Sequence, residues 1–215
     1  MSLQYKTAIV QNHYYSLIYP KLPLTYEHWV ISLLRDRKSR FPEHAFLIVE
    51  GVNAWGRLIL HRYDLATSIP GQIIPDGYAK VSIKLYSGLN WESFHDILRS
   101  DILKADNQGR GFESIVGHAW SVSRAKCLQL HRAILSEKEK GLLPYSHLGK
   151  ESWISSNGHN CYTWCREQLL ELGIPKVKAD LPNKTTDYIG VHPKFHLTIS
   201  PDRRIPPRQE GCLVM

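Results

Sequence analysis

The chain has 215 residues, of which 43% are hydrophobic and 22% are charged, and its formal net charge is +7. This length supports one full hydrophobic core, and the composition is that of an ordinary globular protein. The four cysteines are too few and too unevenly spaced for the disulfide framework of a small secreted domain, so we expect reduced thiols.

The N-terminal sequence MSLQYKTAIVQNHYYSLIYPK has no basic start followed by a long apolar run, so it contains no recognisable secretory signal. No apolar stretch approaches the roughly 20 residues that a membrane-spanning helix needs. We therefore expect a cytoplasmic protein, or one exported by a route that leaves no such signal. The positive charge is diffuse and favours acidic partners, but it forms no helical basic stripe and accompanies no aromatic-rich RNA-binding signature. We therefore expect no nucleic acid partner.

Residues 7–11 predict a short strand, and residues 25–40 predict a helix that ends in a basic turn. The helix is expected because four apolar side chains recur at helical spacing. These side chains are Trp29, Val30, Leu33 and Leu34.

Residues 44–52 and 56–65 are two β-rich runs that are joined by a short loop around Asn53 and Ala54, which predicts a β-hairpin. The alternating apolar residues of 79–87 predict a third strand.

Residues 90–104 and 121–141 both predict amphipathic helices. The first is expected to begin at the N-cap Asn90 and the second at the N-cap Ser123, with Gly141 ending the second. A loop then extends to residue 160, and a last strand is expected at 195–200.

The sequence NGHNCYTWCREQLLELGIP predicts a helix that begins at Cys161 and is closed by Gly173. Helical spacing places Cys161 at the N-terminal end of its buried stripe. In the first turn, the backbone N–H groups and the helix dipole favour an anion, so they favour a thiolate. A histidine within hydrogen-bond reach would complete the activation. The alternative is a purely structural role as a small apolar residue, which suits Cys165 and Cys127 better.

A zinc site is a second alternative. The candidate ligands are His147, His159, Cys161 and Cys165. However, the two cysteines have C-x3-C spacing and no second Cys/His pair stands nearby, whereas structural zinc sites usually combine two pairs. We therefore expect neither a metal nor another cofactor.

The stretch HNCYTWCREQL opens an aromatic-bearing helix late in the chain with an Asn-Cys pair, and HAFLIVEG, far upstream, is a strand that begins with histidine. This order resembles the circularly permuted branch of the papain-like cysteine hydrolases, which includes lecithin-retinol acyltransferase-like enzymes, relatives of the murein endopeptidases and deubiquitinase-like peptidases. The resemblance covers roughly residues 44–172. It implies an α+β fold in which a small antiparallel sheet packs against a nucleophile-bearing helix and additional helices.

The same resemblance implies that Cys161 is the nucleophile and His44 the general base. The backbone N–H of Cys161 would then form part of an oxyanion hole. His159 and Asn160 are candidates for the second donor, although Asn160 could equally be the N-cap of the helix.

A third catalytic residue would orient the imidazole. If the hairpin turn centres on its loop, residue 46 faces residue 61, and His44 and His61 share one sheet face as diagonal neighbours. His61 is therefore the first choice for the third residue, and Asp64 and Glu50 are the reserves. A shift of one residue in register would place His61 on the other face.

The last four residues, CLVM, match the CaaX prenylation signal with Cys212 as the lipidated residue. They follow a Pro-rich stretch with basic residues, so we expect a catalytic domain at 1–200 and a flexible basic tail at 201–215. One lipid chain and a basic segment together hold a protein at an anionic membrane. The expected partners are therefore a prenyltransferase and an anionic membrane surface.

Together these features predict a membrane-tethered thiol hydrolase, which would be a peptidase, isopeptidase or amidase that forms an acyl-enzyme with a protein substrate. The alternatives are a lipid acyltransferase or phospholipase of the same fold and a non-catalytic prenylated adaptor. A lipidation signal that a host cell reads, without a secretory signal, resembles the effectors of intracellular bacterial pathogens, so action at a host-cell membrane also fits.

Overall fold

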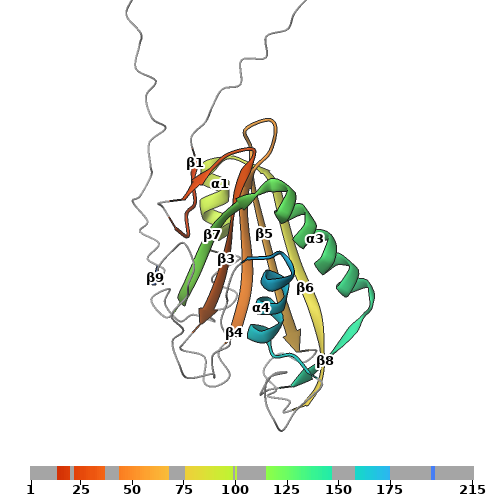
Figure 1. The fold of residues 1–215 in the computed structure, drawn as a ribbon. Coiled ribbons are helices and arrows are strands. Elements are labelled where there is room, and N and C mark those ends of the chain that lie inside the picture. Colours follow the sequence, from red (N-terminus) through yellow and green to blue (C-terminus); the bar gives the residue numbers. More distant parts are fainter. Residues whose placement is uncertain are drawn as a thin grey trace, which may run out of the picture.

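The computed structural model describes residues 14–19, 22–36, 44–67, 76–98, 100, 115–146, 158–174 and 195–196. Its main sheet has seven strands, which are β3 (His28–Asp36), β4 (His44–Val52), β5 (Leu58–Thr67), β6 (Asp76–Leu89), β7 (Ile115–Ser123), β8 (Leu142–Ser146) and β9 (Phe195–His196). The strand order is β8-β6-β5-β4-β3-β7-β9, and every neighbouring pair is antiparallel (Figure 1). A separate small sheet pairs β1 (Tyr14–Tyr15) with β2 (Pro23–Leu24).

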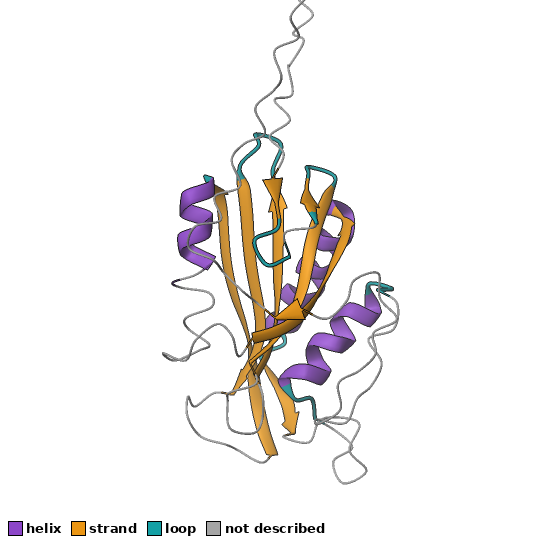
Figure 2. Cartoon of the chain, turned by 90° about the vertical axis from the view of Figure 1, so that its left-hand side faces the viewer, coloured by secondary structure: helices purple, strands orange, loops and turns teal. Residues whose placement is uncertain are grey.

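Three helices are described, α1 (Trp91–Asp96), α3 (Arg124–Glu139) and α4 (Cys161–Glu171). The short helix lies on one face of the sheet, and the two longer helices lie on the other (Figure 2). The described part of the chain is therefore α+β with a mostly antiparallel sheet, as the sequence predicts, although the sheet is larger than expected. None of these helices combines the length and hydropathy of a membrane span.

Each face of the sheet carries its own hydrophobic core, because side chains alternate along the strands. On β4, Ala45, Leu47 and Val49 pack in the core that includes residues of α3 and α4. Phe46 and Ile48 face the opposite way, into the core beneath α1. The helices α3 and α4 therefore share a core with Ala45, Leu47 and Val49, whereas α1 shares a core with Phe46 and Ile48.

The predicted helix at 25–40 is wrong, because most of this stretch forms β3 in the middle of the sheet. Val30 and Ile31 are 0% exposed although they point to opposite faces. The two hydrophobic cores bury both faces of β3, so its sequence is nearly continuously apolar and mimics helical spacing.

The predicted β4–β5 hairpin exists, but the predicted register is wrong. The turn is longer than expected, since Asn53 N–H donates to the Arg57 carbonyl at 2.8 Å and Gly56 has a φ of 71°. The strands consequently pair Phe46 with Asp64. This offset of three residues reverses the face of every β5 side chain relative to the prediction.

The N-caps Asn90 and Ser123 are confirmed, because their side chains accept from the amides of Ser93 and Lys126. Helix α3 is shorter than predicted, because residues 121–123 belong to β7. The segment expected to be a loop after Gly141 instead starts with β8.

Several predictions lie outside the described residues. These are the strand at 7–11, residues 197–200 of the strand predicted at 195–200, His147, the tail at 201–215 and Cys212.

Candidate active site

Helix α4 begins at Cys161 because the residue before it forms a complete capping box. The Asn160 side chain accepts from the Thr163 N–H at 2.8 Å, and the Asn160 N–H donates to Thr163 Oγ1 at 3.0 Å. These two bonds satisfy amide groups that a helix N-terminus leaves without a partner in the helix. The Asn160 side chain is therefore the predicted N-cap.

The chain that leads into α4 is fixed to β8. Ser146 N–H donates to the His159 carbonyl at 3.1 Å, and His159 N–H donates to the Pro144 carbonyl at 3.1 Å. A Cβ at Gly158 would lie 2.6 Å from the Ser146 nitrogen, so only glycine fits this close approach. The start of α4 is thereby held in one position relative to the sheet.

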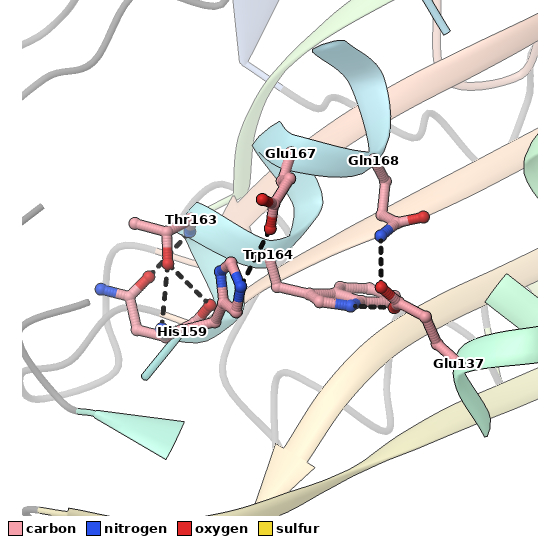
Figure 3. Close-up of polar contacts among 7 residues, drawn as sticks. Glu137, His159, Thr163, Trp164, Glu167 and Gln168 are labelled. Atoms are coloured by element: carbon pink, nitrogen blue, oxygen red, sulfur yellow. Dashed lines mark hydrogen bonds and ion pairs between the residues drawn. The ribbon is translucent and has the colours of Figure 1, made fainter. Parts of the chain in front are cut away.

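Polar contacts fix the body of α4 (Figure 3). Trp164 Nε1 and Gln168 Nε2 both donate to the carboxylate of Glu137 on α3, at 2.7 and 3.2 Å. His159 Nε2 lies 2.9 Å from Glu167 Oε2, so the carboxylate engages the ring that was a candidate oxyanion donor. The contacts with Glu137 hold α4 against α3, on the sheet face where Cys161 is buried.

The sulfur of Cys161 meets β4 at its first residues. The Ala45 N–H donates to Cys161 Sγ at 3.3 Å, and Cys161 is only 4% exposed. Because peptide geometry places this nitrogen about 2.4 Å from the Cα of His44, the sulfur lies within about 6 Å of that Cα. The sulfur of the predicted nucleophile therefore lies close to the backbone of the predicted base at the start of β4, on the sheet face opposite to the His44 imidazole.

Two further residues hold the first turn of α4 beside this point. The guanidinium of Arg35 on β3 lies 4.7 Å from the ring centroid of Tyr162. Arg35 is also the register partner of Ala45, so α4 begins directly above the strand pair that carries His44.

The imidazole of His44 lies on the α1 side of the sheet. It stacks on Phe46, with ring centroids 5.9 Å apart, and its Nε2 lies 3.7 Å from Asp64 Oδ1. The side chain is 30% exposed, whereas that of Asp64 is 8% exposed. With Nε2 toward the carboxylate, Nδ1 is the ring nitrogen nearer to the backbone at the start of β4.

Asp64 is ionised in this arrangement. Burial alone would raise its pKa, but the neighbouring His44 and the charge of Arg62 together hold the pKa of Asp64 below its ordinary value. Arg62 Nε donates to Asp64 Oδ2 at 3.0 Å. A buried, ionised carboxylate can orient a neighbouring imidazole and stabilise its charged form.

The structure does not bring His61 to His44. His61 pairs with Val49, so it faces α3, where its Nδ1 lies 2.9 Å from the Tyr63 hydroxyl. The same hydroxyl lies 3.0 Å from Nδ1 of His131. Burial, aided by the nearby His131, lowers the pKa of His61 to about 4. His61 is thus neutral at pH 7 and belongs to a different polar cluster.

Glu50, the other reserve, is also separate from His44. Its carboxyl group accepts hydrogen bonds from the Ser16 hydroxyl and, at 2.8 Å, from the Leu17 N–H. Burial outweighs these bonds and raises the pKa of Glu50 to about 7. Glu50 therefore binds the N-terminal segment rather than the imidazole.

None of the three cysteines in the described residues forms a disulfide, and their surroundings differ. Burial raises the pKa of Cys127 to about 12 and that of Cys165 well above its ordinary value. The sulfur of Cys161 accepts a backbone N–H from the second residue of β4. Within the described residues, His, Cys, Asp and Glu side chains form no group of three or more that could hold a metal.

Comparison of the chain with family models, curated proteins and solved structures found no match.

Proposed function

We propose that the protein is a thiol hydrolase with Cys161 as nucleophile, His44 as general base and Asp64 as the residue that orients the imidazole. The observation that carries this proposal is the meeting of α4 with the start of β4. There the Cys161 sulfur accepts the Ala45 N–H at 3.3 Å, next to a histidine whose Nε2 faces a buried carboxylate.

In the proposed reaction, Nδ1 of His44 takes the thiol proton while Sγ attacks a carbonyl carbon of the substrate. To do so, the imidazole must approach the sulfur around the beginning of β4, because His44 stacks on the α1 side. The tetrahedral intermediate expels an amine, which receives the proton from His44, and leaves a thioester on Cys161. Water then attacks the thioester while His44 accepts its proton. The C–S bond breaks, the carboxylic acid product leaves, and the Cys161 sulfur takes the proton back from His44.

The backbone N–H of Cys161, in the first turn of α4, is the proposed donor to the oxyanion. Because Asn160 is the N-cap, the Cys161 amide is the first of α4, where the helix dipole favours negative charge. The substrate is proposed to be an amide or isopeptide bond of a protein, and a lipid ester is the alternative that the same chemistry would cleave.

The tail is proposed to be farnesylated on Cys212, and its arginines to add attraction to anionic headgroups. The replacement Cys212→Ser would then move the protein from the membrane fraction to the soluble fraction of a eukaryotic cell. Host-cell delivery by a bacterium remains one setting for this tether.

A non-catalytic adaptor is the second candidate, favoured by the burial of Cys161, which is 4% exposed. Turnover of p-nitrophenyl acetate separates the two. A hydrolase is expected to release a burst of one equivalent of nitrophenolate and to carry an acetyl group on Cys161 by peptide mass mapping.

The replacement Cys161→Ala is expected to remove the burst, whereas Cys165→Ala, one turn deeper in the same helix, is expected to keep it. Circular dichroism serves as the control for the folding of both variants. An equal burst from wild type and Cys161→Ala would exclude the proposed nucleophile, and folded wild type without any burst would favour the adaptor.

A further inference from the structure

We infer that Arg62 is a positioning residue of this site, which fixes the carboxylate of Asp64 where it faces the imidazole of His44. The inference rests on the proposed function, because it assigns Arg62 a role in the same constellation. Sequence analysis gave Arg62 no role.

The geometry is a closed set of four contacts on one sheet face. His44 Nε2 lies 3.7 Å from Asp64 Oδ1, and Arg62 Nε lies 3.0 Å from Asp64 Oδ2. The Arg62 guanidinium lies 4.4 Å from the centroid of Phe46, on which the imidazole stacks. The register pairs Phe46 with Asp64, so two neighbouring strands supply two residues each. Each side chain of the set thus touches two others.

Burial makes this arrangement costly unless the charges are paired. Arg62 is 4% exposed and Phe46 is 0% exposed. A buried ion pair contributes little net stability compared with apolar residues of similar volume, whereas the removal of one partner is strongly destabilising. The pair is therefore better explained by orientation of a functional group than by stability of the core.

Arg62 also sets the charge that His44 meets. Its positive charge is one of the causes that hold the pKa of Asp64 below its ordinary value against the effect of burial. Among the described residues, the titratable neighbours of this pair include His44 and Lys84, which is opposite Arg62 on β6. Across the sheet, the charges of Asp64 and Arg62 act on the thiol of Cys165 in opposite senses. Without Arg62, burial would dominate and Asp64 would keep its proton to higher pH.

The test is the pH dependence of alkylation of Cys161 by iodoacetamide, measured on the full chain by mass spectrometry of the Cys161 peptide. In Arg62→Met, the acid limb of this profile is expected to move upward by about one pH unit or more, because Asp64 protonates earlier on acidification. Arg62→Lys keeps the positive charge, and its acid limb is expected to return to the wild-type position.

A second comparison holds even if Arg62→Met alone does not fold. The double variant Arg62→Met/Asp64→Asn removes both charges together, so neither is left buried without its partner. If Arg62 acts only through Asp64, the double variant and Asp64→Asn alkylate at the same rate. Additional loss in the double variant, or a wild-type acid limb in folded Arg62→Met, overturns the inference.

The variant His44→Ala separates this inference from the proposed function. If its profile differs from that of wild type while that of Arg62→Met does not, only the role of Arg62 is wrong. If the profiles of His44→Ala and wild type coincide, the imidazole does not act on the thiol, and both the proposed function and the inference fail.

Discussion

At the scale of single residues, Asp64 lies between two basic side chains, those of His44 and Arg62. Its depressed pKa means that the folded protein binds its proton less readily than the unfolded chain does. The stability that Asp64 contributes is therefore fully present above the unfolded pKa and is lost as the pH falls through the lower folded pKa. At neutral pH the carboxylate is charged and can orient the imidazole.

This assignment predicts opposite outcomes for two residues of β5. The replacement Asp64→Asn is expected to slow acylation of Cys161 at least ~10-fold, because an amide stabilises the imidazolium less than a carboxylate does. The replacement His61→Ala is expected to leave the rate within about twofold, since His61 lies on the opposite face. The rate of acetylation by p-nitrophenyl acetate, normalised to the folded fraction, measures both effects. The reverse ranking would restore His61 as the third residue.

Gly56 is the residue that indicates the true register of the β4–β5 hairpin. Its φ of 71° is the left-handed conformation that glycine favours at the end of a longer hairpin turn. The glycine after Trp55 was therefore an available signal for the true register. Cys161, His44 and the reserve Asp64 could be selected from the sequence, whereas Arg62 could not, because its importance depends on that register.

At the scale of elements, the position of Cys161 depends on how α4 is held to α3. Glu137 is the point of contact, since its carboxylate accepts from Trp164, which is 1% exposed, and from Gln168, which is 2% exposed. Both donors lie on the buried side of α4. Loss of the carboxylate would leave their N–H groups buried without that acceptor.

The replacement Glu137→Ala is therefore expected to lower the free energy of unfolding by about 2 kcal/mol, the typical effect of removing hydrogen bonds to a charged group. The exposed Glu139, on the same helix, provides the matched control, and Glu139→Ala is expected to change stability by less than about 0.5 kcal/mol. Urea denaturation followed by circular dichroism measures both. Similar stability of the two variants would show that α4 does not depend on this contact.

Elements with a clear period or cap were predictable, and those defined by distant neighbours were not. The caps Asn90, Ser123 and Asn160 act locally, and the sequence indicated all three. The strand β3 was mistaken for a helix because its two faces are buried by segments distant in sequence that pack on either side of the sheet. Strand β8 was missed because its pairing with β6 joins segments far apart in sequence.

At the scale of the whole molecule, a buried acid links the N-terminal segment to the sheet. The folded pKa of Glu50 is about 7, above its ordinary value of 4.5. The sign of the effect follows from this difference. The associated stability is fully present below the unfolded pKa and is lost as the pH rises from about 4.5 through about 7. His61, with its lowered pKa, gives stability that is lost in the opposite direction, as the pH falls from 6.5 toward about 4.

Because these two effects oppose each other, the contribution of Glu50 is best measured as a difference. The replacement Glu50→Gln removes only its titration. The unfolding free energy of the variant minus that of wild type is therefore expected to rise by up to about 3 kcal/mol between pH 4.5 and 7. Glu92→Gln, at an exposed position of α1, is the control with no such change. A difference that is independent of pH would show that folding does not shift the pKa of Glu50.

The central claim is that the imidazole of His44 and the thiol of Cys161 act as one unit, and the rate of Cys161 alkylation from pH 5 to 9 in wild type and His44→Ala tests it most directly. If the claim holds, wild type reacts rapidly at neutral pH and is at least ~10-fold faster there than the variant, whose rate rises only near the ordinary thiol value of ~8.5. Superimposable profiles for the two proteins would contradict it.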